Sequence, residues 1–87
     1  MNRSAIARIL DIHERLIRGE CMTSVSIARK WECSERTIKR DIEFMRDRMR
    51  LPIGWDGGNR TLVYTDKIYG DYFRIETLRH YLERTEC

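Results

Sequence analysis

Two amphipathic helical patterns lie within residues 23–49, and only the tripeptide at 32–34 separates them. Thr23 can cap the first helix, and Ser34 can cap the second by accepting a hydrogen bond from a backbone amide two or three residues later. The residues of the first helix that can face inward are Val25, Ile27, Ala28 and Trp31. Two short helices joined by so brief a turn must cross at a steep angle. The stretch therefore predicts a helix-turn-helix.

The second of these helices is predicted to run from Glu35 to about Arg50, with one apolar and one polar face. Its inner stripe is Ile38, Ile42, Met45 and Met49, extended to one side by Phe44. Its first turns carry on the opposite side Glu35, Arg36, Thr37, Lys39 and Arg40. Leu51-Pro52 ends it, because the residue before proline is disfavoured in the helical region. A cationic helix held by its apolar face can enter the DNA major groove.

The charge of the chain is concentrated in the same stretch. Residues 29–50 contain eight basic and five acidic residues, a difference of three that equals the net charge of the whole chain, +3. The other nine basic and nine acidic residues balance. Such a local basic patch suits a phosphate backbone. An ordinary solvated face with mixed charges would have the same composition.

An earlier helix is predicted from Ser4, as its cap, to about Arg18, and Gly19 supplies a C-terminal stop. Its apolar stripe is Ile6, Ile9, Leu10, Ile12, His13, Leu16 and Ile17. Because His13 falls on this stripe, a packed, neutral histidine is favoured over a catalytic one.

A β-hairpin is predicted after the proline. Ile53 and Trp55 alternate before the segment 56–59, Asp-Gly-Gly-Asn, and residues 62–65 favour β-structure. The two glycines can adopt the positive φ angles of a tight hairpin turn, with Arg60 beside the tip. A two-stranded ribbon placed after such a helix is called a wing. Trp31 and Trp55 could stack on bases, but their places on apolar stripes favour core packing.

The end of the chain reads as a connector, 66–71, and a weaker helical pattern, 72–86. Its apolar residues are Phe73, Ile75, Leu78, Tyr81 and Leu82. This segment is too short to form its own core, so it must pack on the first helix or on a second copy of the chain. We expect a homodimer through Phe73, Leu78, Tyr81 and Leu82, and intramolecular packing is the alternative.

Other classes of function find little support. The 87 residues suffice for one domain. Three widely spaced cysteines without a CxxC motif argue against zinc sites and disulfides, and Cys33 is expected to be a small buried residue. No paired acids, activated nucleophile or phosphate-binding glycine loop indicates an enzyme, so we expect no catalytic residues, metal or cofactor. No apolar run is long enough to span a membrane, and a cytoplasmic protein is expected.

The segment 23–45 closely resembles the N-terminal helix-turn-helix of DeoR-type and WYL-type bacterial transcriptional regulators. The family pattern is a Leu-Ala pair, an apolar-Ser turn and Thr-Ile-x-Arg-Asp-Leu. The matching positions are Ile27-Ala28, Cys33-Ser34 and Thr37-Ile38-Lys39-Arg40-Asp41-Ile42. The hairpin is similar to the wing of the WYL-type subgroup. Glu32 stands where the family often has glycine, which implies a slightly different turn and an acid near phosphates.

The resemblance, which covers roughly residues 6–65, implies a mainly α fold with a small β-hairpin: a winged helix-turn-helix with a three-helix core and a two-stranded wing. The helical pattern at 72–86 adds an extra C-terminal helix. Residues 1–65 would be the DNA-binding domain and 66–87 a connector and dimerisation segment. The residues expected to meet DNA are Thr23, Ser34, Glu35, Arg36, Thr37, Lys39, Arg40 and Arg60. Regulators of this family usually continue into a ligand-sensing domain, whereas this sequence ends at Cys87. We therefore expect either a free-standing DNA-binding module or the DNA-binding part of a larger protein, and no effector is carried over.

Within that set, Arg36 is the strongest candidate for base reading, because a guanidinium can pair with guanine O6 and N7. Ser34 and Thr37 are placed to donate to phosphates at the helix N-terminus. Lys39 and Arg40 are expected to clamp the backbone, the alternative being solvation or pairing with Glu35 and Glu43. Arg60 could reach the minor groove or its phosphates. Asp41 is expected to orient Arg40 or a neighbouring basic residue.

These expectations describe a sequence-specific double-stranded DNA-binding protein that regulates transcription, a repressor being favoured over an activator. The helix at about 35–50 would lie in the major groove with the wing at about 53–65 alongside. Two copies would read an inverted repeat. The alternative is a winged-helix module for protein–protein contact within a larger assembly.

Overall fold

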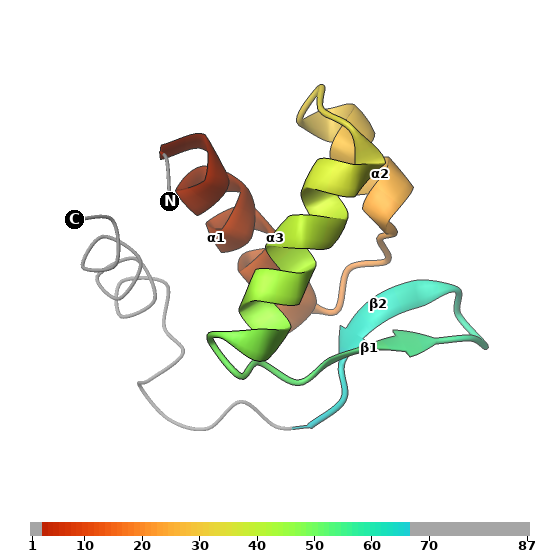
Figure 1. Ribbon diagram of the computed structural model, residues 1–87. Coiled ribbons are helices and arrows are strands. Elements are labelled where there is room, and N and C mark those ends of the chain that lie inside the picture. The colour runs from red at the N-terminus through yellow and green to blue at the C-terminus, as the bar shows by residue number, and fades with distance from the viewer. Residues whose placement is uncertain (1–2, 67–87) are drawn as a thin grey trace.

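The computed structural model describes residues 3–66, which form three helices followed by one β-hairpin (Figure 1). The elements are α1 (Arg3–Arg18), α2 (Ser24–Lys30), α3 (Glu35–Asp47), β1 (Ile53–Asp56) and β2 (Thr61–Tyr64). This mainly helical arrangement is consistent with the layout of a winged helix-turn-helix, so the predicted fold class is confirmed. From residue 67 on, the predicted connector and C-terminal helix lie outside the described residues.

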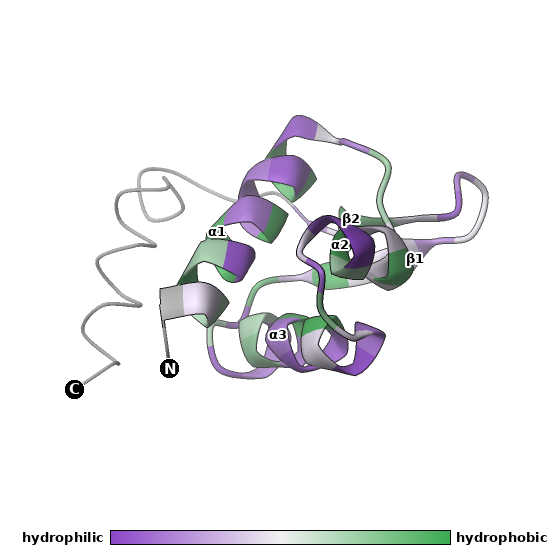
Figure 2. Ribbon diagram, turned by 90° about the horizontal axis from the view of Figure 1, so that it is seen from above, coloured by the Kyte–Doolittle hydropathy of each residue, from purple (hydrophilic) through white to green (hydrophobic). Residues whose placement is uncertain are grey.

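The apolar stripes of the three helices meet in one core. Figure 2 shows the hydrophobic sides of the helices turned toward one another and the hydrophilic sides turned outward. The buried residues of this core are Ile6, Ile9, Leu10, Ile12, Leu16, Met22, Ile27, Ala28, Ile38, Ile42, Met45, Leu51 and Ile53. Val25 and Ile17, which were expected to face inward, are instead 40% and 52% exposed. No helix in residues 3–66 has the length and apolar character needed to cross a membrane.

Each helix is followed by a residue with a left-handed backbone. After α1 it is Gly19, with φ of 71°, as predicted. After α2 it is Glu32, with φ of 52°. The amides of Glu32 and Cys33 donate to the carbonyls of Arg29 and Ala28, which is the Schellman arrangement. The expectation that Glu32 needs a different turn was therefore wrong, because the glutamate adopts the conformation that glycine favours.

Two helix boundaries differ from those predicted. Because Ala5 and Ile6 already pack in the core, α1 starts at Arg3, and Ser4 lies inside the helix and not at its cap. Helix α3 ends at Asp47 and not near Arg50. Arg50 has φ of 54°, which returns the chain to the core at Leu51, where the exposed fraction is 1%.

The strands pair antiparallel, with Ile53 opposite Tyr64 and Asp56 opposite Thr61. Four residues therefore join them, and the left-handed position belongs to Arg60, with φ of 52°, so the expected positive φ at the two glycines was wrong. A loop of four residues is built around a different turn from the two-residue loop that such glycines suit. Asp56 orders the tip by accepting from the amides of Gly58 and Asn59.

Contacts from α1 and from the segment before α2 hold the hairpin. The Leu62 amide donates to the Met22 carbonyl at 2.9 Å, and the Met22 amide donates to the Thr61 hydroxyl at 2.8 Å. His13 is fully buried, as predicted, and its Nδ1 lies 2.6 Å from the Tyr64 hydroxyl. The base of the wing is thus fixed to the helices, while its tip extends beyond them in both Figure 1 and Figure 2.

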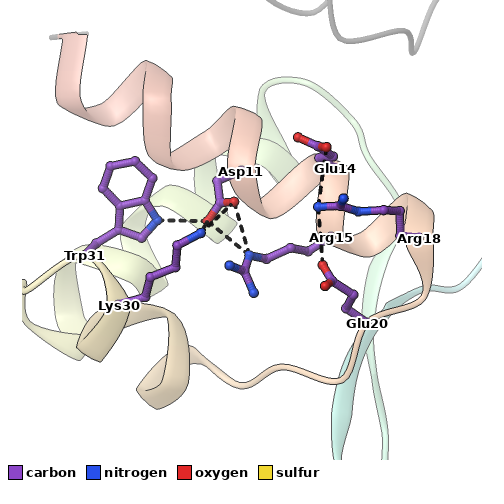
Figure 3. A network of polar contacts seen from close by, with 7 residues as sticks. All are labelled: Asp11, Glu14, Arg15, Arg18, Glu20, Lys30 and Trp31. Carbon is purple, nitrogen blue, oxygen red and sulfur yellow. Dashed lines mark hydrogen bonds and ion pairs between the residues drawn. The ribbon is translucent and has the colours of Figure 1, made fainter.

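A polar network joins α1 to the end of α2 (Figure 3). Asp11 accepts hydrogen bonds from Arg15 Nε at 3.1 Å, Lys30 Nζ at 3.2 Å and Trp31 Nε1 at 3.0 Å. Burial opposes ionisation of this carboxyl, but the hydrogen bonds from Trp31, Lys30 and Arg15 outweigh it and lower its pKa. Trp31 is half-buried against the core, in agreement with its expected packing.

Replacing Glu32 with glycine should stabilise the protein. A side chain in the left-handed region costs about 1–2 kcal/mol, part of which is offset by the greater freedom of glycine in the unfolded chain. We expect Glu32→Gly to raise the free energy of unfolding by about 0.5–1 kcal/mol in urea denaturation followed by circular dichroism. The control Arg29→Gly, inside α2, should lower it by about 1 kcal/mol. A loss of stability in Glu32→Gly would contradict the account of this turn.

The Asp11 network should make stability depend on pH in the acid range. Because the folded-state pKa of Asp11 is lowered, its contribution is fully present above the unfolded pKa, about 4, and is lost as pH falls through the folded pKa. We expect Asp11→Asn to be about 1–2 kcal/mol less stable than wild type at pH 6, and the difference to shrink below pH 4. The control Glu14→Gln, in an exposed pair with Arg18, should change stability little at either pH. A difference that is constant with pH would exclude this linkage.

Candidate nucleic-acid interface

Helix α3 presents an outer face on which both signs of charge are exposed. Its buried residues are Ile38, Asp41, Ile42 and Met45. Its exposed residues are Glu35, Arg36, Lys39, Arg40, Glu43, Arg46 and Asp47. Four cations and three anions give this face a net charge of about +1. The separation into an inner apolar and an outer charged face agrees with the pattern in the sequence.

The orientation of α3 depends in part on Asp41, whose predicted pairing with Arg40 was wrong. Asp41 is buried and pairs with Arg8 of α1, 33 residues away, and not with Arg40. Arg8 donates from Nε and Nη2 to the two carboxylate oxygens, the second contact being 3.3 Å long. The side chains are 14% and 9% exposed. A carboxylate in this position requires a partner, and α1 supplies one that sequence periodicity cannot reveal.

A second contact holds the far end of α3. Arg46 Nε donates to the carbonyl of Ile53 at 3.2 Å, which links α3 to β1. Arg46 thereby fixes the helix against the wing while it remains exposed.

The two predicted N-caps are present. Ser34 accepts from the Thr37 amide at 3.1 Å, and its hydroxyl lies 3.0 Å from that of Thr37. Thr23 caps α2 in a reciprocal arrangement with Ser26, in which each side chain accepts from the other residue's amide. Ser34 is exposed, and Thr23 and Thr37 are half-buried. Capping therefore leaves Ser34 at the surface, at the N-terminal end of α3.

Glu35, the first residue of α3, connects α3 to α2 through its side chain. Its carboxylate accepts from the Ser24 hydroxyl at 3.0 Å and pairs with Lys39 Nζ at 3.3 Å. The hydrogen bond from Ser24, together with Lys39, lowers the pKa of Glu35. The pairing of Lys39 with Glu35 that the sequence offered as an alternative is thus formed. Any contact between Lys39 and a ligand must therefore compete with the ion pair that Lys39 already forms with Glu35.

Unlike Lys39, the residues Arg36 and Arg40 form no ion pair within residues 3–66. Both are exposed, and within residues 3–66 neither guanidinium has a hydrogen bond or an ion pair. The alternative in which Arg40 pairs with Glu35 or Glu43 is not realised. Because the two residues are four apart, they lie above one another on the same side of α3. They form an open pair of guanidinium groups on the first two turns of the helix.

Two further residues belong to the wing. Arg60 is exposed at the tip, in its left-handed conformation. Trp55 is 56% exposed, so its expected burial in the core was wrong. Ile53, two residues earlier on the same face of β1, is buried, so the burial of this face ends between the two residues. An enclosed indole buries about 150–250 Å², so this exposure forgoes about 2–3 kcal/mol of hydrophobic stabilisation.

A shallow hollow separates α3 from the wing. It has a volume of about 320 Å³ and is lined by Ser24, Lys39, Ile42, Glu43, Arg46 and Leu62. Its floor is apolar, and its walls carry two cations and one anion. Among residues 3–66, no group of three or more histidine, cysteine or acidic side chains is placed to hold a metal ion.

The expected DNA-facing residues are divided between one helix and its surroundings. Six lie at the start of α3 or on it: Ser34, Glu35, Arg36, Thr37, Lys39 and Arg40. Thr23 lies at the start of α2 and Arg60 at the wing tip. The expected dimerisation residues Phe73, Leu78, Tyr81 and Leu82 fall outside the described residues. Cys33 is half-buried and packs against the core, close to its expected role.

Comparison with known proteins found no matching family model, no similar curated protein and no similar solved structure.

The Arg8–Asp41 pair should show strong coupling. Asp41→Leu leaves a partly buried guanidinium unpaired, and Arg8→Met leaves a buried carboxylate unpaired, so each should lower the free energy of unfolding by about 2–4 kcal/mol. The double variant should recover most of the loss, because an apolar pair of similar volume needs no compensation. Urea denaturation of the four proteins gives the coupling energy. Additive losses would show that the pair does not hold α3.

Proposed function

We propose that this protein binds double-stranded DNA sequence-specifically through α3, with the wing alongside. The open guanidinium pair of Arg36 and Arg40 on the outer face of an anchored helix carries the proposal. Helix α3 has 13 residues, a length of about 20 Å, and its N-terminal turns are its most cationic part. A helix of this kind fits the major groove, about 12 Å wide.

The contacts of the individual residues suggest a division of roles. Arg36 faces outward without a partner in the described chain, which leaves its guanidinium available for bidentate pairing with guanine. Arg40, equally open one turn later, and Lys39, paired with Glu35, would bind phosphates. Ser34 and Thr37 would add hydroxyl contacts at the positive end of the helix. Arg60 would reach the adjacent minor groove or its phosphates.

The resemblance to DeoR-type and WYL-type regulators supports a role in transcription, and we favour a repressor that acts in the cytoplasm. One such module contacts only a few base pairs. We propose that two copies, related by a two-fold axis, read an inverted repeat through successive major grooves. Residues Phe73, Leu78, Tyr81 and Leu82 would supply the contact between copies.

The anions on α3 favour one other function. Glu43 and Asp47 are exposed on the same helix as Arg36 and Arg40, and a mixed face with a nearby exposed tryptophan also suits a protein partner. A winged helix used for protein–protein contact is therefore the second candidate. It predicts no binding to duplex DNA at low salt.

Selection from a random duplex pool, followed by titration of the selected duplex, tests the proposal. We expect log Kd to rise with log salt by about 0.9 for each phosphate neutralised. Arg36→Ala should weaken binding to the preferred duplex about 10- to 100-fold and to a scrambled duplex much less. Lys39→Ala should weaken both similarly. Arg18→Ala is the matched control, because Arg18 ends α1 and pairs with Glu14 and Glu20.

The two candidates give opposite results in this experiment. Enrichment of a common sequence, together with the expected salt dependence, supports DNA recognition. Absence of any duplex binding by the wild-type chain at 50 mM salt or so would refute it and favour the protein-contact module.

A further inference from the structure

The wing carries an exposed aromatic residue that the DNA-facing set does not include. Trp55 is 56% exposed. Within residues 3–66 its indole N–H has no acceptor. Trp31, the other tryptophan, is half-buried and donates to Asp11. The two tryptophans therefore have opposite surroundings, and only Trp55 is available to a ligand.

The register of the hairpin places Trp55 beside the hollow between α3 and the wing. Trp55 is the cross-strand partner of Leu62, and directly opposed residues project from the same face of a sheet. Leu62 lines the hollow together with Lys39 and Arg46 of α3. Cross-strand neighbours have Cβ atoms about 4.5–5.5 Å apart. The Trp55 side chain therefore lies next to a residue that lines the hollow, at the same level of the ribbon as Leu62.

The chemistry of this region matches a sugar–phosphate strand. The cations Lys39 and Arg46 outnumber the one anion, Glu43, and the apolar floor is formed by Ile42 and Leu62. A deoxyribose–phosphate chain presents an anionic oxygen and an apolar sugar face in alternation. An indole can meet both, because its ring packs on the sugar and its N–H donates a charge-assisted hydrogen bond to a phosphate oxygen.

We propose that Trp55 contacts the backbone of a DNA strand that passes between α3 and the wing, with Nε1–H donating to a phosphate. This inference rests on the proposed DNA binding and adds a contact that positions the duplex without reading its sequence. The exposure of Trp55 is then explained by the ligand, since the indole becomes enclosed only when the strand is bound.

Titration of Trp55 variants with duplex DNA tests the contact, the probe being the duplex obtained by selection and a scrambled duplex of equal length. Trp55→Ala should raise Kd about tenfold, and Trp55→Phe, which keeps the ring and loses the donor, about threefold. Both duplexes should be affected equally. Ile17→Ala is the matched control, because Ile17 is similarly exposed, at 52%, but lies on α1; its Kd should equal that of wild type.

Fluorescence gives an independent readout. In Trp31→Phe, Trp55 is the sole tryptophan, and its emission should be quenched on addition of duplex. Should that variant fail to fold, the difference between wild type and Trp55→Phe isolates the same emission.

The outcomes separate this contact from the proposed function. If Trp55→Ala binds duplex as tightly as wild type does, and duplex leaves the emission of Trp55 in the other proteins unchanged, the proposed contact is overturned. The proposed DNA binding is then unaffected. A loss confined to the selected duplex overturns the assignment to the backbone. Emission that changes with protein concentration and not with DNA places Trp55 in a protein interface and also overturns it. A wild-type chain that binds no duplex refutes both proposals.

Discussion

The buried ion pair between Arg8 and Asp41 acts with the apolar residues Ile38, Ile42 and Met45 to set which side of α3 faces outward. A carboxylate on the inner face of a helix is unfavourable unless a cation meets it, and α1 provides that cation at one place only. Successive residues on a helix differ by 100° in direction. A rotation of α3 by one residue would replace Arg36 and Arg40 on the outer face with Thr37 and Asp41. The pair therefore links the packing of α1 to the chemistry of the surface that we propose meets DNA.

The parts of the fold that depend on neighbouring residues could be predicted from the sequence. The caps at Thr23 and Ser34 and the stop at Gly19 follow from side chains within a few positions of the helix ends. The Lys39–Glu35 pair follows from the spacing of four. The partner of Asp41 could not be predicted, because it lies on another helix. The exposure of Trp55 depends on how far the hairpin reaches beyond the helices, which alternation along a strand does not encode.

At the helix ends, two charged residues adopt the left-handed backbone conformation that glycine favours. Of the three left-handed residues that follow the helices, only Gly19 lacks the Cβ atom that makes this conformation unfavourable. Glu32 and Arg50 adopt it because the residues after them, Cys33 and Leu51, must return to the core. Burial of Leu51 alone is worth about 2 kcal/mol, which exceeds the unfavourable energy of one left-handed residue, about 1–2 kcal/mol. The packing of Cys33 and Leu51 therefore determines the backbone conformation of the residue before each of them. The charged side chains of Glu32 and Arg50 remain at the surface.

The mixed charge of α3 bears on how such a protein would discriminate between sequences. Random duplex attracts a protein through its phosphates alone, and a face with net charge of about +1 provides little of that attraction. Glu43 and Asp47 have no partner among the described residues, so each repels phosphate without compensation inside the described chain. Under the proposed function, binding would then depend on directed contacts, from Arg36 to a base and from Arg40 to a phosphate, which only the correct register supplies. Anions on a recognition surface would weaken binding to every sequence, so the discrimination would come from the directed contacts. A second copy on a two-fold axis would restore affinity without loss of that discrimination.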